Sequence, residues 1–216
     1  MKKKIGYLFL FIAFKVLGQK TIYENVHFEE LSKPHETLAI MPFLATLQLD
    51  DEYEVSEDEL QDLERKEGYA VQNALENYFL QRKNKKKLSV TFQDIKNTNA
   101  ILAKNGISID NIDIHTTQEL CDILKVDGII SGNLTLSALI SKGVPEIDFI
   151  SLIMGKSDYG RIGIKISDGA TGKLLWKYEK TISRKSGKDT DEIIESMMKN
   201  AARKFPYDKE RKKKRD

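Results

Sequence analysis

The chain has 216 residues, of which 40% are hydrophobic and 31% are charged. This length and composition suit one globular domain with a single sizeable core. With 35 Lys and Arg against 33 Asp and Glu, the net charge is +2, which argues against a nucleic-acid-binding protein with a strongly basic surface. Four prolines and one cysteine exclude collagen-like, disulfide-scaffold and cysteine-rich zinc proteins.

Residues 1–18 begin with lysines, continue with an apolar stretch and end in a small residue, Gly18, before the polar Gln19. This order predicts a secretory signal peptide, with Val16 three positions before the cleavage point. The apolar stretch is about half of the ~20 residues that a membrane-spanning helix needs. The alternative is a buried or amphipathic first helix. A lipoprotein would carry a cysteine at the cleavage point; since Gln19 stands there, we expect a periplasmic protein that is not a lipoprotein.

A polar lead, residues 19–36, precedes a short apolar run, residues 37–43, whose length suits a strand. Pro42 has no N–H to donate to a sheet, so we expect this strand to end near it. Residues 50–67 then hold ten acidic and two basic side chains. They lack the alternating acids and central glycine of an EF-hand loop, so we expect a solvated loop that leads into a helix.

From Gly68 onward, apolar side chains recur at helical spacing, which predicts an amphipathic helix. Its apolar face consists of Val71, Ala74, Leu75, Tyr78 and Phe79, and its polar face of Gln72, Asn73, Glu76 and Asn77. Residues 88–92 alternate between apolar and polar, which predicts a strand. A second helix begins at the cap Asp94, and Gly106 suits its left-handed C-terminal end.

Thr116 and Glu119 have the spacing of a capping box, which predicts the start of a third helix. The following stretch, residues 127–136, is rich in β-branched side chains and predicts a strand. Gly128 and Gly132 lie within it, which indicates close packing of a neighbour or a bulge.

Residues 161–168 and 174–182 alternate in the same way, and the glycine-containing residues 169–172 between them predict a β-hairpin. A last helix begins at Asp189, and its apolar stripe consists of Ile193, Ile194, Met197, Met198, Ala201 and Phe205. The order of elements predicts an α/β fold with α+β character. We expect a single domain with a mixed central sheet of about five strands flanked by helices.

The sequence shows no motif for catalysis or for binding a cofactor or metal. The three glycine–lysine pairs, 155–156, 172–173 and 187–188, lack the residue spacing of a phosphate-binding loop. The three histidines, His27, His35 and His115, do not have the spacing of zinc ligands. Cys121 lies beside leucines, so we expect a buried apolar filler rather than a nucleophile. We therefore predict no catalytic, cofactor or metal residues, and an enzyme would need a set of residues that no motif signals.

An insertion, residues 141–159, separates two strands that a simple turn would otherwise join. It contains an apolar run with Phe149, Ile150, Leu152 and Ile153. One reading is a buried strand or helix that closes the sheet edge. The other is an exposed element that docks a partner or a second copy of the chain, because insertions of this length in compact domains are often functional.

The tail, residues 208–216, has no apolar side chain and is strongly basic. Such a run cannot bury anything, so we expect it to be disordered. It is either a solubilising tail or an accessory contact with an anionic membrane surface. Secretion argues against nucleic acid as a partner.

Three segments together resemble a known family: residues 40–43 (Ile-Met-Pro-Phe), residues 124–134 with Asp-Gly-Ile-Ile-Ser-Gly, and residues 168–176 with Asp-Gly-Ala-Thr-Gly and Trp176. The series is similar to the envelope α/β domain shared by the TolB amino-terminal domain, the CsgG-type curli secretion protein and the lipoprotein activators of penicillin-binding proteins. The resemblance covers nearly the whole predicted domain, residues 37–207. Its motifs are more specific for a fold than for a function.

Within these motifs, Asp168, Thr171 and Gly172 suit a structural turn, and Trp176 suits the core. The resemblance implies a secreted, non-enzymatic cell-envelope protein that binds or assembles with envelope protein partners. A homo-oligomer is one form this could take, and an oligomeric outer-membrane secretion component of CsgG type is an alternative. The CsgG-type pore has two membrane hairpins per subunit, however, whereas only one clear apolar run is present here. An unrecognised envelope enzyme is the other alternative.

Overall fold

The computed structural model describes residues 21–48, 56–137, 158–183, 189–201 and 205–209. In chain order they form β1 (Thr21–Glu24), α1 (Phe28–Ser32), β2 (Thr37–Ile40), β3 (Leu44–Leu47), α2 (Glu57–Asn84), β4 (Thr91–Phe92), α3 (Ile95–Lys104), the 3-10 helix η1 (Ile112–Ile114), α4 (Thr117–Leu124), β5 (Gly128–Leu136), β6 (Asp158–Asp168), β7 (Leu174–Ser183) and α6 (Thr190–Ala201). All the strands join one mixed sheet. The predicted class, a single α/β domain with helices on a mixed sheet, is confirmed.

The sheet has the order β1-β7-β6-β5-β2-β4, and β3 also pairs with β5. β2 and β3 run parallel to β5 one after the other, as two pieces of an interrupted strand. Ile40 pairs with Ile130 and Leu44 with Asn133, so the chain of β2 and β3 has one residue more than β5 at this point. This bulge falls at Pro42, which cannot donate a ladder hydrogen bond.

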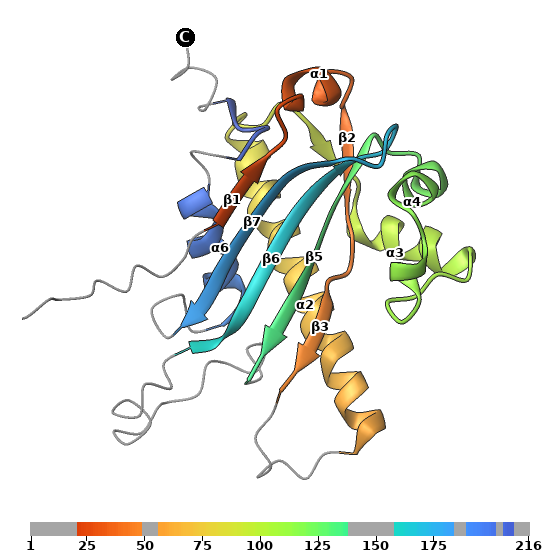
Figure 1. Cartoon of the computed structure of the whole chain (residues 1–216), viewed down its shortest axis with the longest axis vertical. Helices are drawn as coiled ribbons and strands as arrows, with labels where there is room; N and C mark the ends of the chain where they lie inside the picture. Colours follow the sequence, from red (N-terminus) through yellow and green to blue (C-terminus); the bar gives the residue numbers. More distant parts are fainter. Residues whose placement is uncertain (1–20, 49–55, 138–157, 184–188, 202–204, 210–216) are drawn as a thin grey trace, which may run out of the picture.

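Helices pack on both faces of the sheet, but they cover it unequally (Figure 1). α2 and α6 lie on one face and enclose the larger core, whose biggest fully buried side chains are Trp176, Tyr178, Phe43, Phe79 and Phe205. α3 and α4 lie on the other face and enclose a smaller core that contains Ala39, Met41, Leu120, Leu124 and Ile129. Neighbouring residues of β2, such as Leu38 and Ala39, belong to different cores because successive strand side chains point to opposite faces.

The close approach of α2 to the sheet explains the Pro-Phe and Ser-Gly motifs. Phe43 is fully buried, and its ring lies against Gly132. A Cβ at Gly132 would be 2.3 Å from Cε1 of Phe43 and 2.0 Å from the carbonyl oxygen of Gly163. A Cβ at Gly68 of α2 would likewise be 2.1 Å from the carbonyl oxygen of Phe43. Glycine is therefore required sterically where helix, bulge and strand meet.

Within the residues that the structure describes, the sheet has seven strands, against about five predicted. One extra strand, β1, lies in the lead that sequence patterning left without structure, and α1 follows it there. β1 gains its order from pairing with β7 at the sheet edge, a contact that local patterning does not reveal. The second extra strand, β3, is the continuation of β2 beyond Pro42.

The long helix α2 begins earlier than its apolar face suggests. Ser56 is its N-cap, and Ser56 and Glu59 form a capping box, so the first turns of the helix lie within the acidic stretch. Acidic side chains near a helix N-terminus also stabilise the helix through their interaction with its dipole. Gln72, assigned to the polar face, is in fact fully buried and donates a hydrogen bond from Nε2 to the carbonyl oxygen of Ile40 at 2.7 Å.

Among the described helices, none combines the length and the hydropathy that a membrane crossing requires.

Candidate functional site

The described residues assemble no metal centre and no reactive thiol. They contain no cluster of three or more His, Cys, Asp or Glu side chains that could hold a metal ion. Cys121 is buried against α3 and the sheet. Burial, followed by the nearby Asp168 carboxylate, raises the pKa of its thiol to about 12. Because the thiolate is the nucleophilic form, this cysteine is inert at neutral pH.

A buried polar network joins three distant segments of the chain. His35 lies before β2, Asp168 ends β6, and Tyr207 belongs to the C-terminal segment. The imidazole Nδ1 is 2.5 Å from the Tyr207 hydroxyl, and Nε2 is 2.8 Å from Oδ1 of Asp168. The side chains of His35 and Asp168 are only 1% and 2% exposed.

Protonation in this network follows from the state of Asp168. Burial by itself raises the pKa of Asp168, but hydrogen bonds from the hydroxyl and backbone N–H of Thr171 and from His35 outweigh it, so the pKa lies below its ordinary value. An ionised carboxylate only accepts, so Nε2–H of His35 donates to Asp168. In the neutral imidazole Nδ1 then accepts from the Tyr207 hydroxyl.

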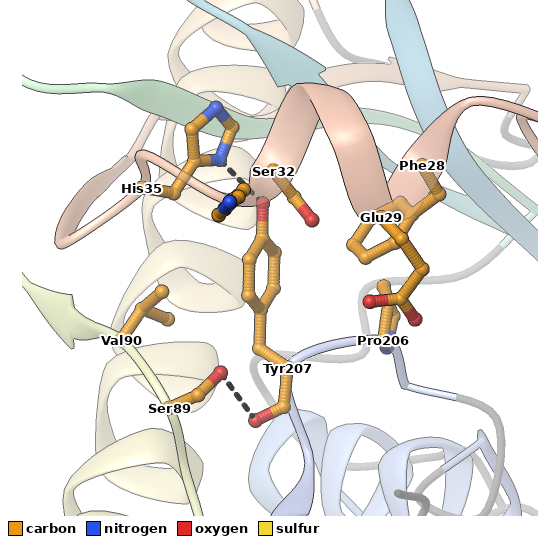
Figure 2. A pocket seen from close by; sticks show the side chains of 9 residues that line it. Phe28, Glu29, Ser32, His35, Ser89, Val90, Pro206 and Tyr207 are labelled. Carbon is orange, nitrogen blue, oxygen red and sulfur yellow. Dashed lines mark hydrogen bonds between the residues drawn. The ribbon is translucent and has the colours of Figure 1, made fainter. Parts of the chain in front are cut away.

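The order hydroxyl, imidazole, carboxylate is the order of a nucleophilic triad, but the surroundings argue against catalysis. Tyr207 is 3% exposed, and burial, assisted by Asp168, raises its pKa far above the ordinary value. The hydroxyl therefore stays protonated, as it does at rest in a catalytic triad, but the burial of Tyr207 keeps it from a substrate. A cavity of about 300 Å³ lies beside Tyr207 and His35, and Figure 2 shows the tyrosine hydroxyl turned toward the imidazole. We interpret the network as a structural tie.

Further contacts hold the C-terminal segment, Phe205–Lys209, against the domain. Asp208 is 1% exposed and forms an ion pair with Arg82 of α2. The backbone N–H of Ser89 donates to the carbonyl oxygen of Tyr207 at 2.9 Å, and the backbone N–H of Lys209 donates to the carbonyl oxygen of Lys87. The segment therefore belongs to the fold, and the predicted start of the tail at residue 208 is wrong: Asp208 is buried because Arg82 pairs with its carboxylate.

The turn residues singled out in the sequence lie together at the β6–β7 hairpin. Oδ2 of Asp168 accepts from the backbone N–H of Thr171 at 2.9 Å and from its hydroxyl. Gly172 has a φ of +69°, a conformation that favours glycine. Trp176 is fully buried in the larger core. The same carboxylate thus closes the turn and anchors His35, and this second role has no local sequence signal.

The predicted partner-binding residues, Phe149, Ile150, Leu152 and Ile153, lie outside the described residues, as do residues 1–20 and 210–216. The structure does define where the insertion joins the fold. β5 ends at Leu136 and β6 begins at Asp158, so the last two residues of the interval assigned to the insertion are strand.

A polar face of the sheet, here called the open face, has no helix over it among the described residues (Figure 1). It continues the face that α3 and α4 cover over β2, the start of β5 and the adjoining end of β6. Strand registers place its side chains in rows, and they are Tyr23, Thr46, Ser131, Asn133, Thr135, Arg161, Lys165, Lys177, Glu179 and Thr181. Lys177 and Glu179 form an ion pair at 2.7 Å.

A groove of about 250 Å³ lies where η1 and α4 meet the open face. Its lining is mixed: the floor includes the buried apolar side chains Met41, Leu120 and Ile129, and the rim includes the partly exposed Leu44 and the polar side chains Asp113, His115, Asn133 and Lys165. Leu44 is 37% exposed, and Ile114, between two rim residues, is 76% exposed. Apolar side chains that face solvent next to a groove are typical of a binding surface rather than of a closed core.

No family model matches the chain, and a search of curated proteins found no match either. Among solved structures, lipoprotein GNA1162 from Neisseria meningitidis shares 11% identity over 68% of this chain and 80% of its own, with a TM-score of 0.43. The C-terminal domain of LpoB from Salmonella enterica shares 9% identity over 73% and 93%, with a TM-score of 0.36. PelC from Paraburkholderia phytofirmans, a dodecamer, shares 9% over 84% and 97%, also with 0.36. None of these three is a TolB or CsgG protein, so the resemblance to those two remains a prediction.

Proposed function

We propose that this protein is a secreted, non-enzymatic component of the bacterial cell envelope that docks another envelope protein through the open face of its sheet. The observation that carries the proposal is the groove at the margin of the open face, with the partly exposed Leu44 and the cation Lys165 in its lining. The strands under the open face pair antiparallel, so a solvated polar face is ordinary there, and the groove distinguishes this face from a plain solvated one. The envelope location is supported by the order of lysines, apolar stretch and small residue in residues 1–18, which is typical of a signal peptide.

Photocrosslinking in the native host tests this proposal. A photoreactive amino acid at Thr135 or Thr181, both on the open face, is expected to give a discrete crosslinked band. The matched control is Asn73, an exposed residue on α2 at the opposite side of the sheet. Docking through this face would be refuted if neither Thr135 nor Thr181 gave a crosslinked band, or if the photoreactive residue at Asn73 gave the same band.

The secreted location is tested on the same cells. We expect the protein in the periplasmic or outer-membrane fraction, with an N-terminus at Gln19 by mass spectrometry. A cytosolic protein that retains residues 1–18 would contradict this part of the proposal.

The insertion remains a proposed second contact, with Phe149, Ile150, Leu152 and Ile153 as its anchors. Deletion of residues 141–157 keeps all of β6 in place and is expected to weaken copurification with the crosslinked partner. The basic tail, residues 210–216, is proposed as an accessory contact with an anionic surface. Unchanged copurification by a folded deletion variant would remove the insertion from the interface.

A further inference from the structure

The groove and the row of cations next to it define one binding site on the open face. Lys165 stands on the groove rim and pairs in register with Ser131 of β5. Arg161 precedes Lys165 by four residues and lies on the same face of β6, about 13 Å away at the usual rise per residue. No ion pair of either cation is found among the described residues. Within the same part of the chain, the acidic groups near this row are Glu179, which Lys177 neutralises, and Asp113 on the far rim.

The surface between the two cations is formed by the cross-strand neighbours of Gly163. Gly163 lies between Lys165 and Arg161 and has no side chain. Side-chain atoms of Asn133 and Glu179 cover it, the nearest 3.1 Å from where a Cβ would be. An extended chain that follows β6 on this face passes over Asn133 and Glu179 and has Lys165 and Arg161 on either side of them.

The local charge differs from that of the domain. Residues 19–208 carry 25 basic and 31 acidic side chains, so the body of the protein is net acidic. The open face has three cations and one anion. This contrast favours a partner whose contacting surface is acidic, because complementary potentials steer association and select among partners.

The size of the groove favours a single side chain over a small molecule. Pockets that enclose small-molecule ligands measure roughly 300 to 1,000 Å³, whereas this groove measures about 250 Å³. Its apolar floor suits one large aliphatic or aromatic side chain, the anchor that dominates many protein interfaces.

We infer that this site binds an acidic polypeptide segment of a protein partner, with one large apolar side chain in the groove and carboxylates beside Lys165 and Arg161. The inference rests on the proposed function, since it specifies the chemistry of the partner that docks on the open face. The spacing of the two cations corresponds to about four residues of an extended segment.

Peptide selection tests the inference even though the partner is unidentified. A phage-displayed library of random 12-residue peptides is panned on the purified protein. We expect enriched peptides to contain a large apolar residue with Asp or Glu within about four positions. The affinity of one such synthetic peptide, measured by fluorescence anisotropy, is expected to fall at least about tenfold in Lys165→Glu and in Leu44→Ser. It should also fall with rising salt.

Lys104→Glu is the matched control, because it makes the same charge change at an exposed position of α3 away from the groove. It should leave the affinity unchanged. Enriched peptides without acidic residues, or an affinity that Lys165→Glu leaves intact, would overturn the inference. A third result would also overturn the inference: no peptide is enriched, and the protein instead binds anionic phosphatidylglycerol vesicles in a way that Lys165→Glu abolishes. If photocrosslinking from Thr181 persists while peptide selection fails, the docking face stands and only this site is wrong; loss of crosslinking refutes the proposed function itself.

Discussion

The substitution Tyr207→Phe tests whether the buried network ties the C-terminal segment to the domain. It removes one oxygen atom and leaves the ring in place, so packing against Phe28 and Phe205 is retained. The lost interaction is the hydrogen bond to Nδ1 of His35. A typical hydrogen bond contributes about 0.5–1.5 kcal/mol, and a buried acceptor left without a donor costs about 1–3 kcal/mol. We expect the free energy of unfolding to fall by about 1–3 kcal/mol.

Urea unfolding followed by the fluorescence of Trp176 provides the assay. This is the only tryptophan of the chain, it is fully buried, and its ring centroid is 5.7 Å from that of Phe205. The midpoint should fall while the dependence of the free energy on urea stays constant. Hydrogen exchange should also quicken at the N–H of Ser89, which donates to the carbonyl oxygen of Tyr207.

Tyr23→Phe is the matched control, because it deletes the same atom at a site that is 45% exposed. Exposed substitutions of this kind change stability by less than about 0.5 kcal/mol. If Tyr207→Phe has no larger effect than Tyr23→Phe, the hydrogen bond does not stabilise the fold, and the interpretation of the network as a structural tie is wrong.

Three further predictions concern the core and its titratable groups. The folded pKa of Asp168 lies below its unfolded value, so the contribution of its ionised carboxylate to stability is present above the unfolded pKa, about 3.9, and is lost as the pH falls through the folded pKa. The stability difference between the native protein and Asp168→Asn, measured by urea unfolding, should therefore shrink below about pH 4. A difference that stays constant with pH would contradict this. Gly132→Ala, which overlaps backbone atoms, should cost about 1–3 kcal/mol by thermal or urea unfolding. Gly163→Ala on the adjacent strand should cost clearly less, and equal costs would speak against the steric argument. The thiol of Cys121 should react with a disulfide reagent at pH 8 only after unfolding, whereas rapid labelling of the native protein would show that it is accessible.

Much of the fold was predictable because its signals are local. The capping box of Thr116 and Glu119 forms as expected and starts α4. Alternation predicted β6 and β7, and the glycine at the left-handed position of their turn is Gly172. Helical and strand periodicities arise within a few residues of the chain, so they are visible before any contact between distant segments is considered.

Other features depend on contacts between distant residues. β1 is ordered by β7, and Gln72 is buried because the carbonyl oxygen of Ile40, at the bulge, needs a donor. His35 and Tyr207 are 172 residues apart, and nothing near either one predicts their hydrogen bond. The surface proposed for function has the same origin.

The sequence by itself determined the fold class, the positions of most helices and strands, and the absence of a recognisable catalytic motif. It directed attention to the insertion, because an apolar run stands out along a chain. The tertiary structure placed Lys165, Arg161 and Leu44 on one face of the sheet. They come from β3 and β6, and only the strand register brings Leu44 and Lys165 to the same groove, with Arg161 farther along β6. A binding surface made from several strands leaves no continuous signal in the sequence, because its residues are neighbours across the sheet and not along the chain.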